Sequence, residues 1–333
     1  MRLPKIGMGT FGSDKYDENV VANSVKRALE LGYKLFDCAS VYGNEKQIGE
    51  VFRDAFDRGV TKREKIVIMS KVWNDMHGEG KVIESCMQTL KDLGVSYLDV
   101  YFLHWPFPNY HAKGCDVTSR SEDSRPFFVE DFMVAWRQME YLKKNGYVKE
   151  IAMSNMTIPK FEAVLPLCKI KPFAHEMELH PTFQQKELCE YCEKHGMKII
   201  GYCPLGSPNR PERDRSMLDL SDIQMDVIVD IAKGHNCHPA EICLAWALEK
   251  GYVPIPFASR EENLKKNLRV KRNIKLTDIE MAMLDRLDSD NRLIKGQVFL
   301  WKGSNDWQDL WDINGKLDKW EKVNDEWIKI MED

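Results

Sequence analysis

Short apolar runs alternate with amphipathic helical patterns along most of the chain. The apolar runs have the length of buried strands and lie near residue 6 and at residues 34–37, 66–71, 98–104, 147–153, 173–177, 198–203 and 253–257. Between them, apolar residues recur at helical spacing, as in residues 19–31 and 45–56. Strands that alternate with helices predict a parallel sheet with helical crossovers, and eight such units close into a barrel. We therefore expect an α/β fold, a (β/α)8 TIM barrel.

The alternative arrangement is a doubly wound open sheet, which binds dinucleotides through a glycine-rich loop after its first strand. We do not expect the glycine-rich segment after Ile6 to be such a loop. A barrel of this kind keeps its chemistry at the mouth formed by the carboxyl ends of its strands. The sequence predicts long loops there, because residues 105–129 and 205–220 show no periodic pattern.

The last part of the chain departs from the alternation. Residues 291–333 carry five tryptophans, Trp301, Trp307, Trp311, Trp320 and Trp327, among polar residues. Tryptophan is costly to expose in numbers. We therefore expect residues 1–290 to form the barrel catalytic domain and residues 291–333 to form a tail that packs on it.

Composition gives little reason to expect a macromolecular partner. The formal net charge is −4 for 333 residues, and no apolar stretch is long enough for a membrane span. We expect no nucleic-acid, membrane or metal binding, and a monomer or weak homo-oligomer. Nine cysteines and the absence of an apolar leader indicate reduced thiols and a cytoplasmic location. Cys189 and Cys192 form a C-x-x-C pair, which we interpret as helix packing.

Polar residues stand where three consecutive strands end. Asp37, Lys71 and His104 end their apolar runs, and Tyr42 follows Asp37 by five residues. A tyrosine has an ordinary pKa of about 10, and a neighbouring ammonium lowers it. The set predicts a relay in which Tyr42 gives or takes a proton, Lys71 tunes it and Asp37 holds Lys71. His104 would orient a carbonyl oxygen. No member is an obvious nucleophile, so the electrons must come from a hydride donor such as nicotinamide.

Other interpretations of these residues remain open at this stage. A single Lys71–Asp37 pair could be a structural salt bridge, and His104 a core histidine. A barrel lyase or aldolase would use Lys71 to form a Schiff base with its substrate. Four such residues at consecutive strand ends favour the relay.

The chain resembles the aldo-keto reductases, and is similar to aldose reductase among them, along nearly its whole length. The resemblance rests on these segments, which follow the order and spacing of that family: Asp37…Tyr42-Gly43-Asn44-Glu45, Ser70-Lys71-Val72-Trp73, Leu103-His104-Trp105-Pro106, Met153-Ser154-Asn155, Glu178-Leu179-His180-Pro181 and Tyr202-Cys203-Pro204-Leu205-Gly206. It implies a TIM barrel that binds a nicotinamide cofactor. It also implies that Asp37, Tyr42, Lys71 and His104 are the catalytic tetrad, with Tyr42 the general acid in reduction.

The resemblance extends to the binding residues. The cofactor-binding positions that it implies are Thr10, Ser154, Asn155, Glu176, Tyr202, Leu205, Ser207, Phe257, Asn263 and Asn267. Ser154 and Asn155 would contact the nicotinamide carboxamide, and Tyr202 would stack on its ring. The substrate-pocket walls that it implies are Phe11, Trp73, Trp105 and Trp301. We expect core packing to be a more credible role for Trp73 than for Trp105.

Three departures from the family pattern carry predictions. His175-Glu176 stands where the family usually has Asn-Gln. A glutamine both donates and accepts hydrogen bonds, whereas an ionised Glu176 only accepts. The negative charge of an ionised Glu176 would favour binding of the oxidised cofactor, whose nicotinamide ring is positive, over the reduced cofactor. It would therefore favour alcohol oxidation. In addition, the chain begins almost at its first strand, so the hairpin that usually closes the barrel bottom is missing or reduced.

The other departure concerns the cofactor's phosphate. Phe257, Ala258 and Asn263 replace a lysine, a hydroxyl residue and an arginine that grip the 2′-phosphate in the family. Each lost charged hydrogen bond is worth about 1.5–3 kcal/mol. We therefore expect NAD(H) to be favoured over NADP(H), unless Arg260 or a neighbouring lysine substitutes.

The sequence thus predicts an oxidoreductase that transfers a hydride between a nicotinamide cofactor and a carbonyl or alcohol substrate. The substrate is a small molecule, plausibly a polyol or sugar derivative. The alternative function is a cofactor-binding accessory or sensor subunit with little turnover.

Overall fold

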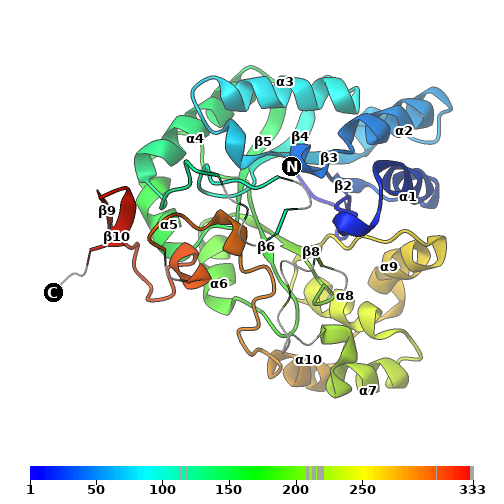
Figure 1. Cartoon of the computed structure of the whole chain (residues 1–333). Helices are drawn as coiled ribbons and strands as arrows, with labels where there is room; N and C mark the ends of the chain where they lie inside the picture. The colour runs from blue at the N-terminus through cyan, green and yellow to red at the C-terminus, as the bar shows by residue number, and fades with distance from the viewer. Residues whose placement is uncertain are drawn as a thin grey trace.

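Eight parallel strands form one curled sheet in the order of the chain, β1 to β8 (Figure 1). This computed structural model describes residues 1–112, 115–116, 119, 121–207, 210–211, 215, 221–304 and 306–330. The strands are β1 Met8–Gly9, β2 Leu35–Asp37, β3 Val67–Val72, β4 Leu98–Leu103, β5 Val148–Ser154, β6 Ala174–Glu178, β7 Lys198–Tyr202 and β8 Val253–Pro254. Two backbone hydrogen bonds, from Gly7 to Pro254 (3.0 Å) and from Gly9 to Pro256 (3.2 Å), close the sheet. The predicted (β/α)8 barrel is confirmed.

Helices surround the sheet, and most follow the predicted ranges. They are α1 Glu18–Leu31, α2 Glu45–Asp57, α3 Lys81–Leu93, α4 Val129–Lys144, α5 Ile158–Val164, α6 Lys186–Lys194, α7 Asp226–Gly234, α8 Pro239–Glu249, α9 Glu261–Asn273 and α10 Asp278–Asp285. Helix α1 shows why these segments are helical. Asp17 caps its N-terminus by accepting the N–H groups of Asn19 and Val20, and Gly32 ends it in a left-handed conformation.

The glycine-rich segment after Ile6 has the spacing G-x-G-x-x-G, which is typical of a doubly wound sheet. Here its glycines permit close contact between the first and last strands. A Cβ atom on Gly9 would lie 2.7 Å from the carbonyl oxygen of Ile255. No strand precedes β1 in the described chain, so residues 1–7 form no hairpin.

An apolar cluster fills the interior of the barrel, and it explains where the polar residues point. The cluster contains Leu35, Met69, Val100, Phe102, Ala152, Ala174, Ile200, Val253 and Ile255. Successive side chains of a strand alternate between its two faces. Asp37, Lys71, His104 and Glu176 each lie two residues beyond a member of this cluster. They therefore point into the barrel at its carboxyl-end mouth.

The tail lies across that mouth. Figure 1 shows it running from α10 over the end of the barrel to a hairpin, β9 Trp320–Val323 and β10 Glu326–Lys329, on the far side. The hairpin contacts the residue that precedes α4, since the rings of Trp327 and Phe128 have centroids 5.2 Å apart. Tail residues Val298, Phe299, Trp301, Leu310 and Trp311 join Trp73, Trp105 and Phe107 in a buried aromatic cluster.

Parts of the predicted loops lie outside the described residues. These are residues 113–114, 117–118 and 120 of the first loop, and 208–209, 212–214 and 216–220 of the second. The division of the chain at residue 290 stays a prediction. Within the described residues, no helix has both the length and the apolar character needed to cross a membrane.

Candidate active site

The four residues of the predicted relay lie together at the barrel mouth. Asp37 ends β2, Lys71 lies in β3, His104 follows β4, and Tyr42 lies in a short 3-10 turn after β2. The buried Lys71 Nζ donates to both Asp37 carboxylate oxygens at 2.6 Å. It lies 5.5 Å from the centroid of the Tyr42 ring. The Tyr42 and His104 rings meet edge to face with centroids 5.8 Å apart.

The acidity of Tyr42 differs from the prediction. Burial raises its pKa above the ordinary value, and the positive charge of Lys71 only partly offsets this. Asp37, and Glu176 when it is ionised, oppose Lys71 and raise the pKa further. The main reason for the difference is the burial of the Tyr42 side chain, and a smaller one is that Lys71 is shared with carboxyl groups. Tyr42 is therefore protonated at neutral pH, which is the form that a general acid needs.

His104 is neutral at the same site. Burial lowers its pKa well below the ordinary value, and the nearby Lys71 charge lowers it further. Its Nδ1 atom is buried and has no hydrogen-bond partner within the described residues. Asn155 fixes its backbone by donating to the His104 carbonyl oxygen at 2.9 Å. A neutral imidazole can donate one hydrogen bond to a carbonyl oxygen.

Glu176 belongs to the same cluster, which the sequence did not indicate. Its Oε1 lies 3.2 Å from Lys71 Nζ, and both side chains are buried. Burial, and then the negative charge of Asp37, raise the Glu176 pKa to about 8. The predicted bias toward oxidised cofactor assumed an ionised Glu176. The premise does not hold at neutral pH, where this carboxyl group keeps its proton.

The neighbouring residue His175 does not offer Glu176 a different partner. The His175 side chain points away from the barrel, where its Nε2 accepts the backbone N–H of Met156 at 3.0 Å. Burial lowers the His175 pKa to about 3, so it carries no charge that could neutralise Glu176.

The pairing of Lys71 with two carboxyl groups argues against a Schiff base between Lys71 and a substrate. Burial alone would lower the Lys71 pKa, but Asp37 and Glu176 raise it well above its ordinary value and keep the amine protonated.

The predicted nicotinamide contacts come from neighbouring strands. Ser154 donates to the Glu176 carbonyl oxygen at 2.8 Å, and the Tyr202 hydroxyl donates to Asn155 Oδ1 at 2.6 Å. The second bond holds the half-buried Tyr202 ring in one orientation. Glu176 Oε2 is buried and has no hydrogen-bond partner within the described part of the chain. A flat ring beside an unsatisfied buried oxygen fits a nicotinamide and its carboxamide group.

The remaining predicted cofactor residues are more widely spread. Thr10 is buried, and its hydroxyl donates to the Asp37 carbonyl oxygen at 2.8 Å. Phe257 follows β8 and packs on Tyr16, with ring centroids 5.5 Å apart. Both asparagines lie on α9, where Asn263 is exposed and Asn267 is buried. Thr10 thus contacts the backbone of Asp37, whereas Phe257, Asn263 and Asn267 form no hydrogen bond with the four relay residues within the described chain.

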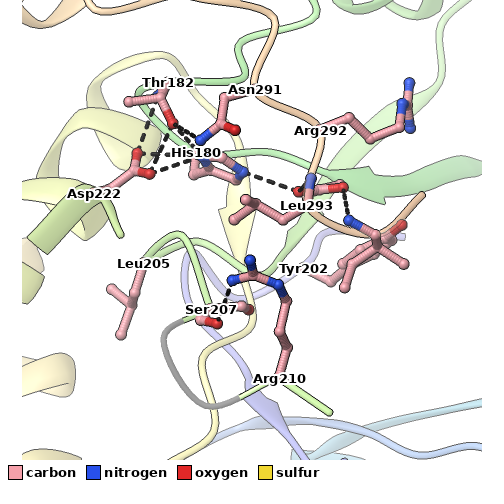
Figure 2. A network of polar contacts seen from close by, with 12 residues as sticks. His180, Thr182, Tyr202, Leu205, Ser207, Arg210, Asp222, Asn291, Arg292 and Leu293 are labelled. Atoms are coloured by element: carbon pink, nitrogen blue, oxygen red, sulfur yellow. Dashed lines mark hydrogen bonds and ion pairs between the residues drawn. The ribbon is translucent and has the colours of Figure 1, made fainter. Parts of the chain in front are cut away.

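A buried polar network around His180 lies beside the loop that contains Leu205 and Ser207 (Figure 2), and its Asp222 packs against Gly206 of that loop. His180 lies between Glu178 (3.0 Å) and Asp222 (3.1 Å), and Asp222 follows the Leu205 loop. Within the loop, Arg210 Nη1 donates to the backbone carbonyl oxygen of Ser207 at 3.1 Å. Burial by itself lowers the His180 pKa, but Asp222 and Glu178 outweigh burial and raise it to about 9. The network thus holds an imidazolium between two carboxylates.

The same network fastens the start of the tail. Glu178 accepts the backbone N–H of Leu293 at 2.8 Å through Oε1 and that of Ile294 at 3.0 Å through Oε2. The sequence segment Glu178-Leu179-His180-Pro181 was part of the family resemblance, but its link to the tail was not predicted. The link joins residues more than a hundred positions apart, for which the sequence carries no local signal.

The predicted pocket walls divide into two groups. Phe11 and Trp73 lie beside the tetrad, with ring centroids 5.1 Å from Tyr42 and 5.2 Å from His104 respectively. Trp105 packs instead on Phe299 of the tail, at 4.5 Å. Trp301 packs on Trp320, at 5.0 Å. Trp73 is thus nearer the chemistry than Trp105, the reverse of what we expected.

Comparison with known proteins gives the same family throughout. The family model described as "Aldo/keto reductase family" matches residues 5–289. An aldo/keto reductase of Synechocystis sp. is 36% identical over 93% of this chain and 94% of its own length. The NADPH-dependent D-xylose reductase of Candida boidinii is 32% identical over 86% of this chain and 91% of its own. The structure of the aldose reductase from Schistosoma japonicum superposes with a TM-score of 0.75 at 30% identity, covering 90% of this chain and 93% of that one.

The predicted preference for NAD(H) over NADP(H) is wrong. Relatives of the chain are named NADPH-dependent, the D-xylose reductase among them. The prediction considered Phe257, Ala258 and Asn263 one position at a time. In the structure, α9 begins within this stretch, with Arg260 at its N-cap and no capping side-chain hydrogen bond. A helix N-terminus attracts phosphate groups and Arg260 adds a cation, so losing a lysine does not remove the attraction for a phosphate.

The predicted accessory or sensor function finds no support, since the relatives are named as reductases. Fold, matching family model and similarity over most of the relatives' lengths all agree. The chain belongs to the aldo/keto reductase family and is an oxidoreductase that transfers a hydride between a nicotinamide cofactor and a small carbonyl or alcohol substrate.

Proposed function

We propose that this chain is an NADPH-dependent reductase of small aldehydes, with open-chain aldose sugars as its substrate class and Tyr42 as the proton donor. The observation that carries the proposal is the Lys71 cluster. A protonated Tyr42, a neutral His104 and a buried ammonium meet at one point of the barrel mouth. The substrate class is supported by relatives that are named aldose and D-xylose reductases.

Each side chain has a defined task in this proposal. The neutral imidazole of His104 donates to the carbonyl oxygen and orients it. The Tyr42 hydroxyl gives its proton to that oxygen as negative charge develops there. Lys71 stabilises the phenolate that remains, and Asp37 keeps Lys71 charged and in place. When bound, the nicotinamide supplies the hydride.

The same proposal assigns the binding residues. Tyr202 would lie under the nicotinamide ring, and Asn155 and Glu176 would meet its carboxamide. Arg260 and the N-terminus of α9 would meet the phosphate of the cofactor. Phe11 and Trp73 would form the walls next to the reacting carbonyl. Support comes from the contacts of these residues with the tetrad and with one another.

We further propose that the enzyme works as a single chain in the cytoplasm. All four tetrad residues come from one chain and are joined within it. All nine cysteines are free thiols, as a reducing compartment allows. Sedimentation of the purified protein over a range of concentrations would test the first point.

The deciding experiment follows NADPH oxidation by the purified protein with D-xylose and with a simple aldehyde. We expect turnover with both, and a loss of about a hundredfold or more in Tyr42→Phe, since the variant lacks the proton donor. NADPH binding, followed by quenching of tryptophan fluorescence, should stay within about twofold because the phenol is not needed to hold the cofactor.

Tyr141→Phe is the control, because it removes the same hydroxyl from a tyrosine that is 49% exposed on α4, and it should retain turnover. If Tyr42→Phe kept full turnover, the assignment of the proton donor would be wrong. If the wild-type protein bound NADPH but none of the carbonyl compounds caused it to oxidise NADPH, the reductase proposal itself would fail.

A further inference from the structure

The Lys71 ammonium is shared by two buried carboxyl groups. Asp37 accepts from Lys71 Nζ through both oxygens at 2.6 Å, and Glu176 Oε1 lies at 3.2 Å. A fourth oxygen, the Cys38 carbonyl, accepts at 3.1 Å. The side chains of Lys71, Asp37 and Glu176 are 0–3% exposed. Four oxygens therefore compete for the three N–H bonds of one ammonium.

The charges in this cluster do not balance if both carboxyl groups are ionised. One cation and two anions would leave a net negative charge without solvent, which is strongly unfavourable. Burial raises the pKa of both carboxyl groups. One retained proton balances the charges of the cluster, because Lys71 then faces a single carboxylate.

The contacts identify Glu176 as the group that holds this proton. Asp37 takes both short bonds from Lys71, whereas Glu176 has one longer contact and an Oε2 without a hydrogen-bond partner in the described chain. Burial and the Asp37 charge raise the Glu176 pKa to about 8. Two carboxyl groups that share one site cannot both ionise easily, so the less favoured one titrates late.

The groups that surround Glu176 come from every adjoining element. Asp37 faces it from β2, Tyr42 from the turn after β2, Lys71 from β3 and Tyr202 from β7. On its own strand, His175 points outward and Glu178 is bound to His180. Among the described residues, Lys71 is the cation that forms an ion pair with Glu176.

We propose that Glu176 is a positioning residue that acts through Lys71, by carrying a proton whose release changes the acidity of Tyr42. The proposal rests on the proposed function of the tetrad. With the proton on Glu176, Lys71 and Asp37 balance each other and Lys71 can stabilise the Tyr42 phenolate. When Glu176 releases its proton to solvent, a second carboxylate competes for Lys71. Its negative charge also opposes the breaking of the Tyr42 O–H bond, so the transfer of that proton to a carbonyl oxygen becomes harder.

The matched variant is Glu176→Gln. A glutamine has nearly the same shape and, like a protonated carboxyl group, both donates and accepts, but it cannot ionise. The kcat/KM of each protein for aldehyde reduction is compared with its own value at pH 6.5, because Glu176 would also meet the cofactor carboxamide. Between about pH 7 and pH 9.5 the wild-type value should fall by about tenfold or more through the ionisation near 8. The variant should show no such fall in this range.

A second measurement does not depend on turnover. Infrared difference spectra of the cofactor-free wild-type protein should show the carbonyl band of a protonated carboxyl group disappearing between about pH 7 and pH 9.5. Glu176→Gln should lack this band. Glu45→Gln is the control, because Glu45 is another buried carboxyl group whose pKa burial raises, to about 7, and its band should vanish separately.

Two results would overturn the proposal. One is a Glu176→Gln protein that loses activity equally at all pH values, or whose kcat/KM still falls near pH 8. A Glu176–Lys71 ion pair with only a structural role would give this result. The other is a wild-type spectrum without the carboxyl band, a result that needs no folded variant. A protein without any reductase activity would refute the proposed function instead, and the infrared test would still decide the state of Glu176.

Discussion

The ammonium of Lys160 binds the carboxylate of Asp312 in the protein interior, 152 positions away along the chain. Lys160 lies in α5 and Asp312 in the tail, and Thr157 donates to the same carboxylate. Lys160 also donates to the Leu310 carbonyl oxygen at 2.8 Å. A buried ion pair therefore fixes the tail to the wall of the barrel.

Lys160→Met should destabilise the protein by about 3–5 kcal/mol, since it leaves the Asp312 charge buried without its partner. Urea unfolding measures the change, and proteolysis should cut the tail of the variant faster. Lys265→Met is the control, because Lys265 pairs with Glu261 on an exposed helix face, where such pairs are worth about 0–1 kcal/mol. The double change Lys160→Met with Asp312→Leu should recover much of the loss. If the single variant were as stable as the control, the pair would not hold the tail.

The buried His180 should make stability fall at high pH. Its pKa is raised from an ordinary value of about 6.5 to about 9, so its contribution is complete below about 6.5 and is lost as pH rises through 9. The shift corresponds to roughly 3 kcal/mol. The free energy of unfolding of the wild-type protein should therefore drop between pH 7 and pH 10 by more than that of His180→Gln. Parallel pH profiles of the two proteins would show that His180 is not a buried imidazolium.

Two aromatic side chains near the mouth should respond differently to truncation. Phe11 is 41% exposed and contacts Tyr42, so Phe11→Ala should raise the KM for aldehyde with little change in stability. Trp105 is buried against the tail, so Trp105→Ala should cost about 3–5 kcal/mol of stability. Steady-state kinetics and urea unfolding of both variants separate the roles. The opposite pattern would place Trp105 in the substrate pocket and Phe11 in the core.

Arg260 should contribute to the binding of a cofactor phosphate. A charged hydrogen bond is worth about 1.5–3 kcal/mol, so Arg260→Ala should weaken NADPH binding by about tenfold or more and leave NADH binding nearly unchanged. Arg272→Ala removes the same charge from the last turn of the same helix and is the control. Fluorescence titrations with both cofactors give the comparison. An equal loss for NADPH and NADH would mean that Arg260 does not meet the 2′-phosphate.

The fold, and the meeting of Asp37, Lys71 and His104 at one mouth of the barrel, could be predicted because their signals are local. Asp37, Lys71 and His104 each end an apolar run, and the alternation of side chains along a strand directs all three into the barrel. Glu176 was recognised as a replacement for glutamine, but its contact with Lys71 depends on strands that meet only in the folded barrel. For the same reason the raised pKa of Tyr42 could not be predicted, since its main cause is burial in the folded barrel.

The tail and the cofactor phosphate show two other limits of the sequence. The tryptophans indicated that residues 291–333 fold against something, but not that Asp312 would pair with Lys160 or that residues 320–329 would form a hairpin. For the cofactor phosphate, the residues Phe257, Ala258 and Asn263 were each interpreted as a lost contact with the 2′-phosphate. The start of α9 at Arg260 supplies an attraction that depends on backbone direction rather than on side-chain identity.

Strand β6 carries Glu176 and Glu178 two residues apart, so both side chains point the same way. One carboxyl group meets the tetrad lysine, and the other holds the first residues of the tail. The two donors are backbone N–H groups, so what Glu178 requires of the tail is its backbone path and not its side chains. A tail from another reductase could therefore be exchanged if its first residues follow the same path past β6. A proline at position 293 or 294 would remove a donor and leave a buried carboxylate oxygen of β6 without its partner.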